Sequence, residues 1–297
     1  MANLKEVRNR IFSVRSTQQI TKAMKMVSAA KLKRAQDAII QMRPYATKLR
    51  EILENLSGSV ENMEGGAYAK VRPVKNILVV AITSNRGLAG AFNANVIRQI
   101  NFLLAGELNN LYKSENVKLV AVGKKASDFF SKNKRLYIKN HNDLFGNLNF
   151  EHTSAVAEKI MQEFVEGKWD KVILVYNHFR NAAVQQIKVE QLLPLAPAEK
   201  PKKEAEEKIK NADYIFEPSK EEIVRDLIPK AIKIQFHKSV LDSHAAEHGA
   251  RMTAMSKATD NAGDLLRELR IKYNKARQAA ITKEILEIVG GAEALKG

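Results

Sequence analysis

Hydrophobic residues near the start of the chain recur at the spacing of one helix face. Leu4, Val7, Ile11 and Val14 are three or four residues apart, and no glycine occurs between residues 4 and 57. The later apolar positions, which shift in phase once, are Ile20, Ala23, Met24, Val27, Ala35, Ala38, Met42, Leu49, Ile52 and Leu56. Because each residue adds about 1.5 Å, the pattern predicts one helix of about 80 Å. A helix of that length needs a partner helix to cover its apolar stripe.

A second long helix is predicted over residues 223–288, interrupted only by Pro229, Gly249 and Gly263. Its apolar stripe steps by four and three through Ala262, Leu266, Leu269, Tyr273, Ala276 and Ala280. Small residues that favour close backbone approach occur in both helices, at Ala29, Ala30, Ala245, Ala250, Ala254 and Ala258. Gly290–Gly291 predicts the end of the second helix. We therefore expect the two terminal helices to pair with each other through a tight seam.

Between the two helices the pattern changes to alternating strands and helices. Strands are predicted at residues 76–83, 117–122, 136–139, 172–176 and 184–193, and helices at 92–112, 124–132 and 153–166. This alternation predicts a small Rossmann-like α/β domain inserted between the helices. The expected organisation is an N-terminal coiled-coil helix (1–57), a linker (58–75), the inserted α/β domain (76–212) and a C-terminal coiled-coil helix with its lead-in (213–297).

Charge and composition narrow the function classes. The net charge is +16, and residues 1–57 hold twelve Lys or Arg against four Asp or Glu, so we expect an acidic partner for the first helix. That partner is either nucleic acid or acidic protein loops. The absence of cysteine excludes disulfides and thiolate metal sites. The longest apolar runs, 77–82 and 172–176, are far shorter than a membrane span, so membrane contact would come through partners.

Residues 84–90 (SNRGLAG) follow a predicted strand and precede a predicted helix, where phosphate-binding loops occur. The segment lacks both the three-glycine dinucleotide fingerprint and the Gly-Lys-Ser/Thr of a P-loop. A tight strand-to-helix turn explains both of its glycines without a ligand. We therefore expect no nucleotide or other cofactor here.

His244-Ala245-Ala246-Glu247-His248 matches the His-x-x-Glu-His pattern of a zinc protease. The spacing places both imidazoles on one helix face, and Glu247 could orient a water molecule. The match falls inside the long paired helix, where no third ligand or substrate cleft is evident. Imidazoles on the flank of a coiled coil are the favoured interpretation, and a zinc hydrolase is the alternative. No catalytic residue and no metal site are expected.

Polar residues crowd the last part of the second helix, at Arg267, Arg270, Lys272, Asn274, Lys275, Arg277, Gln278, Thr282, Lys283 and Glu284. This face is either solvated or a contact surface for something that surrounds the helix pair. A basic coiled-coil nucleic-acid binder is a further alternative. It is not favoured, because the basic residues are interleaved with the stripe and no set of stacking aromatics accompanies them.

Several longer motifs carry a family resemblance. They are ITKAMKMVSAAKL at residues 20–32, RPY at 43–45, TSNRGLAG at 83–90, RMTAM at 251–255, ATDNA at 258–262, YNKARQA at 273–279 and ITKEILEIVGGA at 281–292. In this order, over the whole chain, they resemble the gamma subunit family of the bacterial F-type ATP synthases.

The resemblance implies a non-catalytic central rotor shaft that couples proton-driven rotation of a c-ring to ATP synthesis or hydrolysis. The terminal helices would form a long antiparallel left-handed coiled coil inside a ring of three alpha and three beta subunits. The α/β domain would face the epsilon subunit and the c-ring. Acidic beta-subunit loops would then be the partner of the basic first helix, with no nucleic acid required. The implied location is peripheral, at the cytoplasmic face of a bacterial plasma membrane, and the lack of a presequence fits that location.

The resemblance also implies contact residues. Met24 and Lys25 would lie near an acidic lever loop of a beta subunit, and Glu217 would face the c-ring. The polar contacts between shaft and catalytic ring would come from Arg251, Arg277, Gln278, Thr282 and Glu284.

Overall fold

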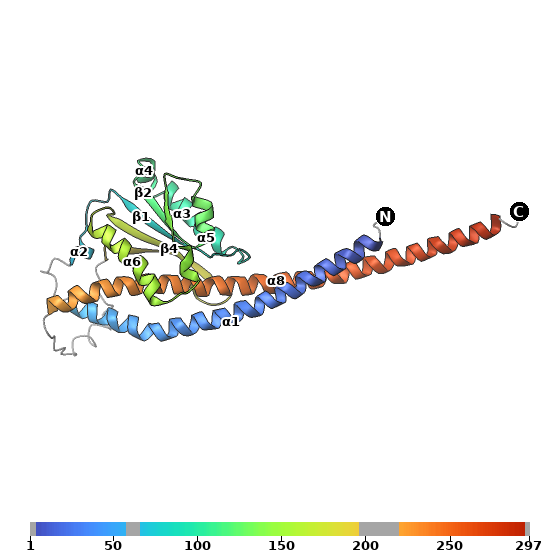
Figure 1. Cartoon of the computed structure of the whole chain (residues 1–297), viewed down its shortest axis with the longest axis horizontal. Coiled ribbons are helices and arrows are strands. Elements are labelled where there is room, and N and C mark those ends of the chain that lie inside the picture. Colours follow the sequence, from blue (N-terminus) through green and yellow to red (C-terminus); the bar gives the residue numbers. More distant parts are fainter. Residues whose placement is uncertain (1–3, 58–65, 196–219, 295–297) are drawn as a thin grey trace. The chain divides into compact units, whose positions relative to one another are not determined.

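The computed structural model describes residues 4–57, 66–195 and 220–294. Its internal contacts divide the chain into two compact units. One unit comprises Met1–Ala29 with Arg251–Gly297, and the other comprises Ala30–Ala250. Each unit is described by itself (Figure 1).

Two long helices supply the ends of the chain. Helix α1 spans Leu4–Ser57 and helix α8 spans Lys220–Ala294, so both predicted terminal helices are confirmed. The predicted end of the second helix at Gly290–Gly291 is wrong, because α8 continues through both residues. Neither glycine has the positive φ that a left-handed C-cap requires.

A mixed sheet forms the centre of the second unit. Its strands are β1 (Ile77–Ile82), β2 (Val117–Val122), β3 (Tyr137–Asn140), β4 (Lys171–Phe179) and β5 (Gln185–Leu193). The order is β3-β2-β1-β4-β5, and every pair is parallel except the β4–β5 hairpin. In the centre, Val80 of β1 lies beside Val120 of β2 and Leu174 of β4. All five predicted strands are therefore present.

Helices cover both faces of this sheet. One face packs on α3 (Phe92–Ala105) and α5 (Lys124–Phe130), and the other packs on α6 (Phe150–Val165) and on α8 (Figure 1). Along β1, Ile77, Val79 and Ala81 belong to the first core, and Leu78, Val80 and Ile82 belong to the second. A strand buried on both faces needs the unbroken apolar run that β1 has.

Short elements complete the described part of the chain. They are α2 (Gly66–Ala69), α4 (Asn109–Lys113) and a 3₁₀ turn, η1 (Asn142–Phe145). The predicted helix over 92–112 is wrong as a single element, because α3 stops at Ala105 and α4 begins anew at Asn109. Gly106 ends α3 with φ −101° and ψ −105°, far from helical values. Within the described ranges, no helix combines the length and the apolar character of a membrane span.

Phe236 of α8 is 0% exposed in the core beneath the sheet, whereas Phe102 of α3 is 70% exposed. We expect Phe236→Ala to lower the free energy of unfolding by about 3–5 kcal/mol, because it leaves a cavity in a close-packed core. The matched control Phe102→Ala should change it by about 0.5 kcal/mol or less. Chemical denaturation followed by circular dichroism measures both values. Equal losses in the two variants would contradict the packing of α8 in this core.

Candidate functional site

The seam of the first unit joins the start of α1 to the second half of α8. Thr259 donates a hydrogen bond from its hydroxyl to that of Thr21 (2.8 Å), and the Lys25 ammonium donates to the Ser256 hydroxyl (2.9 Å). The Gln18 side chain donates to the Thr259 carbonyl at 3.4 Å. Residue numbers rise along α1 as they fall along α8, so the two helices pair in antiparallel fashion.

The covered face of α1 follows an unbroken three-four repeat. Its buried or half-buried members are Leu4, Val7, Ile11, Val14, Gln18, Thr21, Met24, Ser28, Leu32, Ala35, Ile39 and Met42. The predicted shift of phase through Ile20, Ala23, Met24 and Val27 is therefore wrong, since only Met24 is half-buried and the other three residues are exposed. The seam instead keeps its phase and becomes polar in this stretch. The small residues Ala29 and Ala30 are also exposed and do not belong to it.

Polar residues fit in this seam because each finds a partner close by. The Thr21 hydroxyl also lies 3.0 Å from the carbonyl oxygen of Gln18, and the Ser28 hydroxyl donates to that of Met24 at 2.8 Å. Gly263 makes room for the Gln18 side chain, because a Cβ at this position would lie 3.1 Å from the Gln18 amide nitrogen. The hydrogen bonds from Thr259 to Thr21 and from Gln18 to Thr259 join the two helices in one register, and a slip would break them.

The apolar residues that leave the seam gather on the outside of α1. We call Phe12, Ile20, Met26 and Val27 the outer apolar face; their exposed fractions are 72%, 59%, 61% and 57%. Lys22 and Lys25 lie in the same stretch and are also exposed. Exposed apolar side chains that gather in one place mark a surface that binds another protein. The described structure thus places exposed basic and apolar side chains in the same stretch of α1.

The C-terminal end of α8 is exposed on all sides. Along its stripe, Ala262, Leu266 and Leu269 are buried, and Tyr273, Ala276 and Ala280 are half-buried. Every residue from 281 to 293 is exposed. The apolar members of this uncovered end are Ile281, Ile285, Leu286, Ile288 and Val289.

The structure distributes the predicted contact residues over these surfaces. Lys25 is exposed beside the outer apolar face, and Met24 is half-buried next to it. Four residues are exposed near the uncovered end of α8: Arg277, Gln278, Thr282 and Glu284. Arg251 differs from these because it is only 7% exposed. Glu217 lies outside the described residues, as does the predicted lead-in to the second helix.

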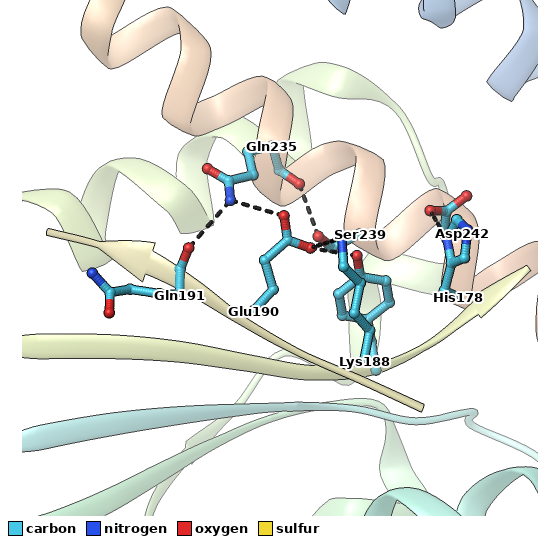
Figure 2. Close-up of polar contacts among 8 residues, drawn as sticks. His178, Lys188, Glu190, Gln191, Gln235, Ser239 and Asp242 are labelled. Carbon is cyan, nitrogen blue, oxygen red and sulfur yellow. Dashed lines mark hydrogen bonds and ion pairs between the residues drawn. The ribbon is translucent and has the colours of Figure 1, made fainter. Parts of the chain in front are cut away.

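In the second unit, a polar layer fastens α8 to the hairpin of β4 and β5 (Figure 2). Glu190 of β5 accepts hydrogen bonds from Tyr176 (2.6 Å) and Gln235 (3.0 Å) and forms an ion pair with Lys188 at 2.9 Å. The Gln235 amide also donates to the Gln191 carbonyl. One turn along α8, the Ser239 hydroxyl donates to the Gln235 carbonyl. Sequence reasoning missed this layer, although Gln235, Ser239 and Asp242 stand at helical spacing within an apolar stretch.

Burial and hydrogen bonding shift two pKa values in this layer. Burial raises the pKa of the Tyr176 phenol well above its ordinary value, and its bond to Glu190 adds to the rise. Burial alone would also raise the pKa of Glu190, but the hydrogen bonds from Tyr176, Lys188 and Gln235 outweigh it and lower the pKa. Glu190 is therefore ionised, and these hydrogen bonds hold its carboxylate in place.

Two histidines make further contacts between α8 and the rest of this unit. His178 of β4 forms a 2.7 Å contact from Nδ1 to the buried carboxylate of Asp242. His237 Nδ1 lies 2.8 Å from the Thr153 hydroxyl of α6, and the Phe150 ring packs edge-on against its imidazole. Burial lowers the pKa of His237, so the folded protein favours the neutral ring.

The glycine-containing turn after β1 is occupied by its own contacts. The Ser84 hydroxyl lies 2.6 Å from the Arg86 carbonyl oxygen and 3.0 Å from the Asn93 amide oxygen. Ala89 and Phe92, at the end of the turn, pack on Ala246 and Ala250 of α8. A tight turn that packs the start of α3 against α8 accounts for this motif.

The His-x-x-Glu-His motif lies on α8 in the second unit. Both imidazoles share one face, as predicted. Among the described residues, no group of three or more His, Asp or Glu side chains could hold a metal ion, so nothing there supports a hydrolytic zinc centre.

Acidification should destabilise the protein through His237. The unfolded chain binds a proton near the ordinary pKa of 6.5, whereas folded His237 stays neutral to lower pH. The free energy of unfolding should therefore fall as the pH drops from about 7.5 to 5.5, by at most about 1.4 kcal/mol per pH unit for this one group. Glu190 affects stability only at lower pH. Because its pKa is lowered in the folded protein, the stabilisation that it provides is lost only as the pH falls below the ordinary value of 4.5.

Denaturant titrations across this pH range test the assignment. His237→Gln should flatten the dependence but not abolish it, because burial and nearby Lys139 also lower the pKa of His141. The control variant is His152→Gln, which alters an exposed histidine of α6. An unaltered profile in His237→Gln would show that His237 is not the responsive group.

Comparison with known proteins gives one consistent family. The model of a family described as ATP synthase matches residues 3–295. The ATP synthase gamma chain of Flavobacterium johnsoniae is 57% identical over 297 residues, and that of Christiangramia forsetii is 56% identical over 297 residues. The gamma chain of Chlorobium phaeobacteroides is 48% identical over 297 residues. Each alignment covers 100% of both chains.

Solved structures give a matching fold. A chain from the central stalk and c-ring of the Tetrahymena thermophila mitochondrial ATP synthase is 28% identical, with a TM-score of 0.60, over 80% of this chain and 99% of that one. A chain from the Euglena gracilis mitochondrial enzyme has a TM-score of 0.67 over 98% of this chain and 94% of that one. At 24% identity the second likeness concerns the fold alone.

Proposed function

Because the chain belongs to the ATP synthase gamma chain family, we propose that it is the central rotor shaft of an F-type ATP synthase. In this role it couples proton-driven rotation of the c-ring to ATP synthesis or hydrolysis on a ring of three alpha and three beta subunits. The shaft itself is not catalytic, since nucleotide is made or hydrolysed on the beta subunits. One observation carries the proposal most directly, which is the exposed outer apolar face of α1 beside a fully satisfied polar seam.

A rotor shaft needs two helices that stay paired and an outer surface that contacts the surrounding subunits. The seam meets the first need through Thr21, Thr259 and their neighbours. The outer apolar face and the uncovered end of α8 meet the second, because they leave apolar side chains for a surrounding ring to cover. The excess of positive charge on α1 suits acidic loops of the beta subunits.

Rotation then acts by shifting conformational populations. One side of the helix pair carries the outer apolar face, so the shaft presents different surfaces to the three catalytic sites. Each surface stabilises one conformation of the subunit that it faces, and turning the shaft moves that preference around the ring.

The resemblance to the family supplies the individual contacts of this proposal. Met24 and Lys25 face the acidic lever loop of a beta subunit, and Glu217 faces the c-ring. Arg251, Arg277, Gln278, Thr282 and Glu284 supply polar contacts to the catalytic ring. Among these, the burial of Arg251 suits a residue that stiffens the helix pair as much as one that binds the ring.

The remaining part of the proposal concerns the membrane side. The α/β layers act as an inserted Rossmann-like domain that contacts the epsilon subunit and the c-ring. The protein is then held peripherally at the cytoplasmic face of the bacterial plasma membrane, through the complex and without a span of its own. The polar layer at Glu190 suits this role, because it fastens the domain to α8 and lets torque pass between them.

Reconstitution tests the proposed function. The purified chain should hydrolyse no ATP alone, and it should restore turnover when it is mixed with alpha and beta subunits. Native mass spectrometry of the mixture should find three alpha subunits, three beta subunits and one copy of this chain. Failure to join an alpha–beta ring would refute the proposal.

The outer apolar face offers a sharper test. The double variant Ile20→Ser/Val27→Ser should fold like the native protein, because both side chains are more than half exposed. It should nevertheless lower ring-dependent ATP turnover by roughly thirtyfold, since two apolar contacts of about 1 kcal/mol each are lost. Val184→Ser/Val189→Ser provides a matched control, because these valines on and beside β5 are 49% and 41% exposed. Equal turnover in the two double variants would remove the outer apolar face from the working surface.

A further inference from the structure

Four segments of the second unit meet at one edge of its sheet, where the parallel strands begin. They lead into β1, β2, β3 and β4, and together we call them the amino edge: residues 70–76, 102–116, 129–136 and 165–170. Hydrogen bonds join neighbouring segments. The Asp170 carboxylate accepts from the backbone amides of Lys75 and Asn76 at 2.9 Å, and the Asn133 side chain donates to the Tyr112 hydroxyl at 2.8 Å. The amino edge is therefore one connected surface.

Positive charge dominates the amino edge. Its four segments contain eight Lys or Arg against four Asp or Glu. Two of the acidic groups are engaged, because Asp170 is 9% exposed beneath its two amides and Glu115 forms an ion pair with Arg135 at 3.3 Å. The exposed basic residues are Lys70, Lys75, Lys113, Lys132, Lys134, Arg135 and Lys168. This surface therefore favours an anionic partner.

Exposed apolar side chains accompany this charge. Val71 and Val74 precede β1, Phe102 lies on the last turn of α3, Phe129 lies near the end of α5, and Val165 ends α6. Each of the five is at least 41% exposed. Lysine head groups interleaved with exposed apolar side chains are typical of surfaces that bind a membrane, where the charges meet phosphates and the apolar groups reach the acyl boundary.

The amino edge lies toward the beginning of α8. The Gln235 side chain donates to the carbonyl of Gln191, which pairs with Ile173 of β4. Further along both elements, His178 of β4 contacts Asp242 of α8. Strand β4 and α8 therefore run in the same direction, so the start of the strand lies toward the start of the helix. The helix leaves this unit at its other end, after Ala250.

We propose that the amino edge binds the anionic phospholipid surface of the membrane. The inference rests on the proposed function, because a ring around the helix pair beyond Ala250 leaves the amino edge toward the membrane. Each Lys or Arg near anionic headgroups adds attraction within about a Debye length. The contact is additional to the attachment through the complex.

Lipid suits this surface better than an acidic protein loop on the stator. Headgroups diffuse and are equivalent around the rotation axis, so attraction to them has no preferred angle and does not oppose turning. A fixed acidic loop would hold the shaft at one angle. The basic residues are also spread over four segments, which suits a broad anionic surface.

Flotation of the full-length chain with phosphatidylcholine vesicles, with and without phosphatidylglycerol, tests the inference. The native chain should float with the anionic vesicles, less so as salt is raised. Lys132→Glu/Lys134→Glu should weaken partition by at least about tenfold. The matched control Lys124→Glu/Lys125→Glu changes the net charge equally at the opposite edge of the sheet, and it should weaken partition by about threefold or less. The basic first helix contributes equally to both variants.

Phe102→Ala probes the apolar part of the contact. Because Phe102 is 70% exposed, the variant should fold normally. It should weaken partition by about threefold, and this loss should not depend on salt, unlike that of the lysine variant. Circular dichroism verifies that all variants are folded.

Two results would overturn the inference. Equal losses in the two lysine variants would show that net charge alone governs binding. Equal flotation with neutral and anionic vesicles would leave the amino edge to an acidic protein partner. ATP turnover of the reconstituted ring separates this inference from the proposed function. A chain that restores turnover but does not float refutes the lipid contact alone, and one that floats as expected but cannot join the ring refutes the rotor role.

Discussion

The structure depends on one constraint, the antiparallel register in which α1 meets α8. The Thr21–Thr259 hydrogen bond and the Lys25–Ser256 contact fix that register with polar groups. A seam of leucines alone could slide by a heptad at modest cost, whereas a slip here would break the hydrogen bonds that join the two helices. Because polar residues occupy the seam, the apolar residues of the same stretch are turned outward. The surface that we propose contacts the ring is therefore coupled to the polar character of the seam.

In the second unit, the sheet is attached to helix α8 by apolar packing and by hydrogen bonds. Residues 232–250 of α8 are buried almost all round, as expected for a helix in a core and not for one on a surface. Apolar packing through Ile232, Phe236 and Val240 supplies most of the attachment. The polar layer around Glu190 fixes the position of the sheet along the helix, because its hydrogen bonds can form only in that position. At Gly249 a Cβ would lie 3.2 Å from the Ala182 backbone, so a larger residue would push the hairpin away.

Much of this fold could be predicted from periodicity, and the failures have physical causes. The long helices, all five strands and their alternation were predictable, because buried strands are apolar runs and the terminal helices keep apolar residues three or four positions apart over long stretches. The phase of the α1 seam was not, because hydrophobicity identifies the covered face only when that face is apolar. Ile20 and Val27 looked like seam residues for this reason, while Thr21 and Ser28 did not. The α8 terminus was missed because Gly290–Gly291 marks a stop only where the backbone turns left-handed. The contact residues could be named by resemblance alone, and the polar layer needed tertiary contacts that no local pattern contains.

The most direct test of the central claim is to link α1 and α8 covalently across the seam and to measure whether the reconstituted ring still turns over ATP. The chain contains no cysteine, so Thr21→Cys/Thr259→Cys introduces a single possible disulfide at side chains whose oxygens lie 2.8 Å apart. The measurement is ATP turnover of the reconstituted alpha–beta ring with this double variant, oxidised and then reduced, with each single variant as control. The account predicts that the disulfide forms and that turnover is the same in both states, because the outer surface works while the seam stays shut. Failure to form the bond, or turnover that is lost on oxidation and recovered on reduction, would contradict it.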